Sequence, residues 1–274
     1  MVEVLETNID MSKFHRNHLI CVNQNDKSVK YLNLLSINIL DAMQLENIRF
    51  VLTDIEGTTT SISFVYDKLF PYFRSNIAKL KDLTQLDEVK KAFNEVIEIS
   101  KQEGKTISTT DEIIQQLEEW SLADKKITPL KTVQGVLWKE AYLSGEILGH
   151  VYEDVAPTME KWKLNGIDLG VFSSGSIAAQ KLIFGYSESG DLTPYFSAYF
   201  DTTTGGKREV ETYGKIAKEL KIPAEQILFL SDIKEELVAA KEAGFQTIQL
   251  VRTGTEKNWD ASVVSFSEIA INEL

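Results

Sequence analysis

The sequence predicts an α/β protein with a doubly wound parallel sheet and an inserted helical cap. Short apolar runs without polar alternation recur along the chain, which is typical of strands that are buried on both faces. Helical segments lie between these runs, as parallel pairing requires. Residues 54–167 separate the first run from the second, whereas a crossover between parallel strands needs only about 10–12 residues. The excess indicates an insertion.

The predicted strands begin after an N-terminal segment of mixed polarity. The runs are bounded and too short for helices. They are IRFVLT (48–53), DLGVFS (168–173), ILFLSD (227–232) and FQTIQLV (245–251), with SAYFDT (197–202) as a weaker fifth. Within the N-terminal segment, residues 29–43 fit either a short amphipathic helix or a strand.

Helices are predicted between the strands from their stop signals. APTMEKWKLNG (156–166) and KEELVAAKEAGF (234–245) reach Gly166 and Gly244, which are placed as helix C-caps. REVETYGKIAKELKI (208–222) precedes Pro223. Inside the insertion, apolar residues share helical faces: Leu86, Val89, Phe93 and Val96; Ile113, Leu117 and Trp120; and Leu130, Val133, Leu137 and Ala141.

These patterns divide the chain into three expected parts. Residues 1–46 form an N-terminal extension without a defined character. Residues 47–65 and 151–274 form the α/β core, and residues 66–150 form the helical cap. Hinges for a movement of the cap are expected around residues 61–66 and at Gly145 and Gly149.

Composition limits the classes of partner. The chain has 274 residues with 41 Asp and Glu against 29 Lys and Arg, a net charge of −12, which argues against a broad nucleic-acid surface. Cys21 is the one cysteine, so no intrachain disulfide forms. No apolar run reaches the roughly 18–20 residues of a membrane helix, and no signal peptide is recognisable. We expect a cytoplasmic monomer without a membrane or nucleic-acid partner.

Reactive residues follow the predicted strands. Asp54 and Glu56 come after the first strand, Ser173 and Ser174 after the second, and Asp232 ends the third. In doubly wound sheets, sites form at the carboxyl ends of the strands. Asp54 and Asp232 are hard oxygen ligands that suit Mg²⁺. An ionised carboxylate at such a site can attack phosphorus, and Glu56 can act as the acid and base.

Two further groups fit an anionic substrate. The hydroxyl of Ser173 and the following amides precede a predicted helix, where an anion binds favourably. Lys207, in the glycine-containing loop TTTGGKRE, can balance charge on a phosphoryl group. Each feature alone has a plain structural explanation: a solvated turn for Asp54 and Glu56, a helix cap for Ser173 or Asp232, and a surface lysine for Lys207. Their order along one sheet favours function.

The motifs DIEGTTT, SSGS, a loop lysine and LSD, in this order, resemble those of the haloacid dehalogenase superfamily, although most phosphatases there have aspartate in place of Glu56. The longer strings LTDIEGTTTSISFVYDKLFPY, LWKEAYLSGEI, VFSSGSIAAQKLIFG and FLSDIKEELVAAKEAG are similar to the acireductone-forming enolase-phosphatases of methionine salvage. The resemblance runs from about Ile48 to Ile269, and residues 1–46 match nothing in that family.

The resemblance implies a role for each matching residue. Asp54 is the nucleophile and an Mg²⁺ ligand, Glu56 is the acid and base with its main-chain carbonyl on the metal, and Asp232 is the third ligand. Ser173, Ser174 and Lys207 hold the substrate phosphate. One Mg²⁺ is expected per subunit. The implied substrate is 2,3-diketo-5-methylthiopentyl-1-phosphate, which is enolised and then dephosphorylated to the acireductone, in the cytoplasm and, for a eukaryotic source, also in the nucleus.

Three hypotheses follow. The leading one is this bifunctional enzyme, and the second is a related phosphatase for another small phosphate ester. The third is a catalytically silent scaffold on the same fold, against which Asp54, Glu56, Lys207 and Asp232 argue. The base that drives enolisation is open: Glu56 is one candidate, whereas Tyr142 and Glu140 of the cap are at least as well explained by packing or solvation.

Overall fold

The computed structural model describes residues 19–22, 29–32, 45 and 47–271. The chain divides into two compact units, residues 1–44 and 45–274. In the first unit, β1 (Leu19–Val22) pairs antiparallel with β2 (Val29–Leu32). The segment 29–43 is therefore a strand over its first four residues, and its remainder lies outside the described residues.

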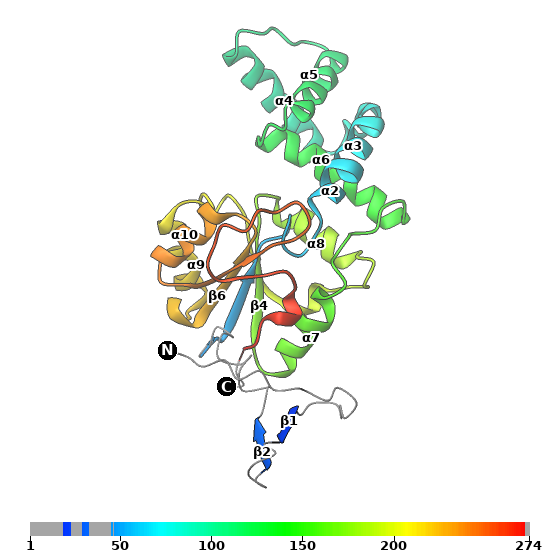
Figure 1. Ribbon diagram of the computed structural model, residues 1–274. Coiled ribbons are helices and arrows are strands. Elements are labelled where there is room, and N and C mark those ends of the chain that lie inside the picture. The colour runs from blue at the N-terminus through cyan, green and yellow to red at the C-terminus, as the bar shows by residue number, and fades with distance from the viewer. Residues whose placement is uncertain (1–18, 23–28, 33–44, 46, 272–274) are drawn as a thin grey trace. The chain divides into compact units, whose positions relative to one another are not determined.

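The second unit is built on a parallel sheet of six strands in the order β5-β4-β3-β6-β7-β8 (Figure 1). The predicted α/β class is confirmed, and all five predicted strands are present. They are β3 (Phe50–Thr53), β4 (Asp168–Phe172), β5 (Phe196–Phe200), β6 (Ile227–Ser231) and β7 (Gln246–Leu250). The sixth, β8 (Ser262–Val263), was not predicted because two residues carry no periodic signal.

Helices cover both faces of the sheet, as doubly wound connections require. Side chains of β3 alternate between two apolar clusters. Val51 packs on the side of α7 (Val155–Leu164) and α8 (Ile177–Gly185), and Phe50 and Leu52 pack on the side of α9 (Val210–Leu220) and α10 (Lys234–Glu242). The short helical turns of this part are η4 (Thr193–Tyr195), η5 (Ala224–Gln226) and η6 (Phe266–Glu268).

The predicted stop signals act as expected. Gly166 and Gly244 follow α7 and α10 with φ of 78° and 94°, in the left-handed region that glycine adopts at little cost. α9 ends at Lys221, itself left-handed with φ of 57°, shortly before Pro223. After each of these helices ends, the chain returns to the sheet: β4 follows α7, β6 follows α9 and β7 follows α10.

The segment between β3 and β4 is mainly helical and gathers beyond the carboxyl ends of the strands (Figure 1). The predicted apolar faces are buried, except that Leu86 is 37% exposed because it precedes the helix as its N-cap. The elements are α2 (Ile62–Phe64), the π-helical turn η2 (Val65–Leu69), α3 (Phe70–Asn76), the 3-10 helix η3 (Ile77–Leu83), α4 (Asp87–Gln102), α5 (Thr110–Leu122) and α6 (Thr128–Ser144).

The chain enters and leaves this helical segment at one place. The Thr60 hydroxyl donates to the carbonyl of His150 at 2.8 Å, and the Ser61 amide donates to His150 Nδ1 at 3.1 Å. The His150 ring stacks against Phe64 and meets Tyr152 edge-on. The segment that leaves the sheet after β3 and the segment that returns toward β4 are therefore hydrogen-bonded to each other. In the described part of the chain, no helix is long and apolar enough to cross a membrane.

Candidate active site

Asp54 follows β3 and lies at the centre of a buried charged cluster. Its amide donates to the carbonyl of Leu230 on β6 at 2.9 Å, so the sheet ladder continues through this residue. The hydroxyl of Thr53 donates to the Asp54 carbonyl at 2.8 Å, and that of Thr59 does so at 3.3 Å. Because the backbone is bonded on both sides, the carboxylate of Asp54 is held in a fixed position at the strand end.

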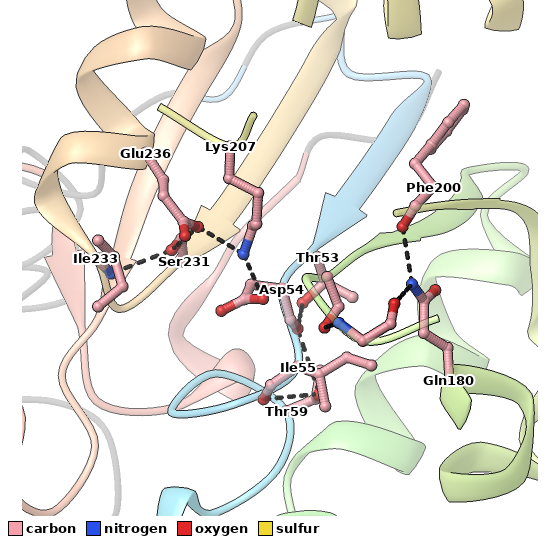
Figure 2. Close-up of polar contacts among 12 residues, drawn as sticks. Thr53, Asp54, Ile55, Thr59, Gln180, Phe200, Lys207, Ser231, Ile233 and Glu236 are labelled. Carbon is pink, nitrogen blue, oxygen red and sulfur yellow. Dashed lines mark hydrogen bonds and ion pairs between the residues drawn. The ribbon is translucent and has the colours of Figure 1, made fainter. Parts of the chain in front are cut away.

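Lys207 reaches Asp54 across 153 positions of sequence. Its Nζ lies 2.6 Å from Asp54 Oδ1 and 2.7 Å from Glu236 Oε2, between the two carboxylates (Figure 2). The Tyr213 hydroxyl donates to the Lys207 carbonyl at 2.6 Å and steadies the loop. Burial opposes the charge on Lys207, but the two carboxylates outweigh it and raise the pKa of the ammonium.

Glu236 is not predicted as a site residue from the sequence, because it lies within the charged first turn of α10. Such a residue usually faces solvent, yet Glu236 is 8% exposed. The Ser231 hydroxyl donates to Glu236 Oε2 at 2.9 Å and accepts from the Ile233 amide at 3.1 Å (Figure 2). The only available signal was its spacing: four positions after Asp232, one turn along the same strand-to-helix junction.

Asp232 lies beside Asp54 without a direct bond to Lys207. Burial, with the negative charges of Asp54 and Glu236, raises the pKa of Asp232 to about 7. Its Oδ1 is buried and, within the described part of the chain, has no hydrogen-bond partner. Gln249 on β7 donates to the Asp232 carbonyl at 3.0 Å. The backbone of Asp232 is thus held in place, and one oxygen of its side chain is left without a partner.

Gly57 makes room for this carboxylate. Its φ of 75° is left-handed, and a Cβ there would lie 2.6 Å from Asp232 Cγ. Any other residue would both strain the backbone and displace Asp232. The glycine of the DIEGT motif is therefore required for the close approach of the first and third strand ends.

Glu56, Ser173 and Ser174 face a cavity between the strand ends and the helical segment. Burial, and next the charge of Asp54, raise the pKa of Glu56. The Ser173 hydroxyl accepts from the Gly175 amide at 3.2 Å, and Ser176 caps α8. Glu56, Ser173 and Ser174 therefore belong to the cavity wall, whereas the buried charged cluster of Asp54, Lys207 and Asp232 is not part of that wall.

The rest of the cavity wall comes largely from the helical segment. Lys131 on α6 lines it and donates to the Ser174 carbonyl at 3.0 Å, which bridges the segment to the core. Apolar side chains of the wall are Ile55, Val65, Leu69, Phe70, Leu130, Trp138, Ala179 and Ile183. Tyr142 is buried against Tyr186, Glu140 is exposed, and neither lines the cavity.

Asp54, Asp232 and the main-chain carbonyl of Glu56 offer oxygen donors of the kind that a divalent cation binds. In the described residues, no group of three or more His, Cys, Asp or Glu side chains is arranged to hold a metal. Two carboxylates with a main-chain carbonyl are a different donor set, and Mg²⁺ commonly takes one or two carboxylates with water and phosphate oxygens. The free Asp232 Oδ1 and the excess of carboxylates over Lys207 fit such a cation.

Comparison with known proteins agrees with this geometry. Residues 48–244 match the haloacid dehalogenase-like hydrolases. A solved structure of the UTR4 protein from Saccharomyces cerevisiae superposes with a TM-score of 0.67 at 32% identity, covering 80% of this chain and 98% of that one. The fold is that of a haloacid dehalogenase-like hydrolase, and the chain belongs to that family.

Curated relatives narrow the class. Enolase-phosphatase E1 of Picosynechococcus sp. is 50% identical over 208 residues, which is 76% of this chain and 91% of the relative. Enolase-phosphatase E1 of Klebsiella oxytoca is 48% identical over 205 residues, 75% of this chain and 89% of the relative. The chain belongs to the enolase-phosphatase E1 family, and it is an enzyme of the hydrolase class.

Proposed function

We propose that the protein is an Mg²⁺-dependent enolase-phosphatase of methionine salvage. It converts 2,3-diketo-5-methylthiopentyl-1-phosphate to 1,2-dihydroxy-3-keto-5-methylthiopentene, the acireductone, and phosphate. One observation carries the assignment of the chemistry to residues: Asp54 is paired with Lys207 at 2.6 Å, beside a buried and unpartnered Asp232 oxygen. Family membership supplies the choice of substrate.

Asp54, Asp232 and the main-chain carbonyl of Glu56 are the residues that would hold one Mg²⁺. When bound, the cation supplies charge neutralisation for the phosphoryl oxygens and keeps neighbouring carboxylates ionised. The elevated pKa of Asp232, which results first from burial and then from Asp54 and Glu236, supports this role. A positive charge nearby would offset the cause of that elevation.

Phosphoryl transfer uses Asp54 and Glu56 in two steps. The Asp54 carboxylate attacks phosphorus, the bond to the ester oxygen breaks, and Glu56 donates a proton to that oxygen. Glu56 then takes a proton from water, which attacks the aspartyl-phosphate and releases inorganic phosphate. The raised pKa of Glu56, caused by burial and by Asp54, suits a group that holds a proton when phosphoryl transfer begins. Lys207, Ser173 and Ser174 bind the phosphate oxygens.

Enolisation needs a base at the carbon that bears the phosphate ester and a proton donor at the neighbouring ketone oxygen. Glu56 is the proposed base because it lines the cavity. It takes a proton from that carbon, the electron pair forms the carbon–carbon double bond of the enol, and solvent supplies the proton on the ketone oxygen. Tyr142 and Glu140 are not proposed because they lie outside that wall. The apolar part of the wall fits the methylthio end of the substrate.

The proposed roles are assigned to the three parts of the chain that the sequence predicts. We propose residues 47–65 and 151–274 as the phosphatase core, residues 66–150 as the cap, and residues 1–46 as an N-terminal extension. The proposed working form is a cytoplasmic monomer that acts on a small phosphate ester. Its acidic charge of −12 makes a nucleic-acid partner unfavourable.

The test supplies purified protein with the diketo phosphate in Mg²⁺ or in EDTA, and follows enol absorbance and free phosphate together. We expect both signals with Mg²⁺ and neither with EDTA or with Asp54→Asn. Asp168→Asn is the matched control, because Asp168 pairs with Lys163 at the opposite end of the sheet. It should retain both signals.

Two outcomes separate the alternatives. Phosphate release from simple esters without enol formation from the diketo phosphate would keep the Asp54 assignment and favour a phosphatase for another ester. Full phosphate release by Asp54→Asn would exclude the covalent mechanism. No turnover of any phosphate ester, with Mg²⁺ present and a folded chain, would favour the silent scaffold.

A further inference from the structure

A buried arginine lies behind the candidate active site, outside every motif of the sequence. Arg252 follows β7 and is 8% exposed. Its Nη1 and Nη2 donate to the two carboxylate oxygens of Asp154 at 3.0 and 2.9 Å. Nη1 also donates to the carbonyl of Val264 at 2.9 Å, and Nε donates to the carbonyl of Thr58 at 3.1 Å. One planar group therefore joins three distant segments.

The guanidinium has little freedom to rotate. The ring of Tyr152 lies 4.1 Å from its central carbon, and the ring of Phe266 lies 5.5 Å away. Asp154 is itself fixed, because it accepts from the Phe266 amide at 2.6 Å and from the Ser265 hydroxyl at 3.1 Å. A planar fork of donors held in this way has one orientation.

The Thr58 carbonyl belongs to the turn that carries the proposed nucleophile and acid. The amides of Thr58, Thr59 and Thr60 all donate to the Ile55 carbonyl, at 3.2, 3.0 and 2.9 Å. The Thr59 hydroxyl returns to the Asp54 carbonyl. The turn 55–60 is thus a small rigid unit, and Asp54 and Glu56 take their direction from it.

Tyr152 supplies a second attachment to the same unit. Its amide donates to the Thr59 carbonyl at 3.0 Å, while its ring covers Arg252. Successive carbonyls, those of Thr58 and Thr59, are therefore bound by Arg252 and by its stacking partner. The contacts do not depend on side chains of the turn, so they fix backbone position directly.

We propose that Arg252, oriented by Asp154, is a positioning residue that fixes the turn 55–60 and thereby aims Asp54 and Glu56. This inference rests on the proposed function for its catalytic consequence. A buried ion pair is a poor way to add stability alone, because desolvation offsets much of its attraction. A bidentate arginine with a further donor on a catalytic turn gains geometric definition instead.

The experiment compares Arg252→Lys and Asp154→Asn with wild type and a control. Lysine keeps the positive charge opposite Asp154 but lacks the planar fork. Phe196→Leu is the control, since Phe196 is buried at the start of β5 and packs on Phe184, away from the turn. Melting temperature, kcat and KM for the diketo phosphate, and amide hydrogen exchange in residues 54–60 are measured.

We expect Arg252→Lys to lower kcat about 10- to 100-fold with KM within about a factor of two, because misdirection of the reacting groups acts on the chemical step. Exchange in residues 54–60 should accelerate, and Asp154→Asn should show both effects more weakly. Phe196→Leu should have a lower melting temperature, with kcat and the exchange in residues 54–60 unchanged.

The proposal is overturned if Arg252→Lys and Asp154→Asn lower the melting temperature as Phe196→Leu does, while their kcat and their hydrogen exchange in residues 54–60 equal those of Phe196→Leu. If wild-type protein turns over no phosphate ester, the proposed function fails, and the exchange measurement alone decides whether Arg252 fixes the turn. Should Arg252→Lys not fold, Asp154→Asn provides the same comparison.

Discussion

Replacement of Gly57 by alanine tests the contact between the first and third strand ends. The new Cβ would lie 2.6 Å from Asp232 Cγ and 3.1 Å from its Oδ1. The first distance is shorter than real Cβ contacts and the second is tight, so the Asp232 carboxylate must move. The left-handed backbone adds a strain of roughly 1–2 kcal/mol. Gly57→Ala therefore combines a loss of stability with displacement of a proposed metal ligand.

A second glycine separates the two effects. Gly145 follows α6 with φ of 77°, and a Cβ there meets no atom within 4 Å. Gly145→Ala should thus carry the backbone strain of roughly 1–2 kcal/mol alone. Gly214→Ala, within α9 and also without a close neighbour, should be neutral or slightly stabilising because alanine favours helices.

The assay is phosphate release against Mg²⁺ concentration, with melting temperature measured in EDTA. We expect Gly57→Ala to need about 10- to 100-fold more Mg²⁺ for half-maximal rate, a loss comparable to that from disturbing a ligand's support. Gly145→Ala should lose a similar amount of melting temperature from backbone strain while keeping the wild-type Mg²⁺ dependence. Wild-type Mg²⁺ dependence in Gly57→Ala would refute the argument that this glycine admits Asp232.

Three other substitutions test separate parts of the structure. Lys207→Met leaves Asp54 and Glu236 buried without their cation, so unfolding in EDTA should become easier by about 3–5 kcal/mol, and denaturant titration measures this. Glu112 accepts from Ser108 and Thr109 amides, which lowers its pKa to about 2; its stabilisation is complete above the unfolded pKa of 4.5 and is lost as pH falls toward 2. Wild type should therefore exceed Glu112→Gln in thermal stability at pH 7, and the two curves should converge near pH 2. Trp138→Phe removes the indole donor to the Leu69 carbonyl, a bond of 3.0 Å in the cavity wall. It should raise KM more than it lowers kcat, and equal losses in both constants would contradict that assignment.

The fold could be predicted because its signals are local. The central strands β3 and β6 are apolar up to their last residue, and Gly166 and Gly244 follow the helices α7 and α10. Asp54 and Asp232 could be placed together from the rule that parallel strands end at one edge. Lys207 could be assigned to the same edge only by motif order, since its pairing with Asp54 spans 153 positions.

Residues that act through the backbone could not be predicted in this way. Arg252 donates to the main-chain carbonyls of Thr58 and Val264. Every residue has such a carbonyl, so the sequence does not show which ones an arginine will bind. Glu236 resembles an ordinary solvated helix residue until the fold buries it. The prediction that Leu86 belongs to a buried helical face was wrong, because the apolar spacing does not show whether the first apolar residue lies inside the helix or just before it.

The crossing of the chain at Thr60, Ser61 and His150 has a consequence for divergence. Because departure and return are bonded to each other, the ends of the intervening segment stay together whatever lies between them. Lengthening such a loop costs little, about 0.6 kcal/mol for each doubling. A lineage can therefore exchange or enlarge the helices between these two positions while the sheet and its strand ends keep their arrangement, and a laboratory graft at the same positions can do likewise.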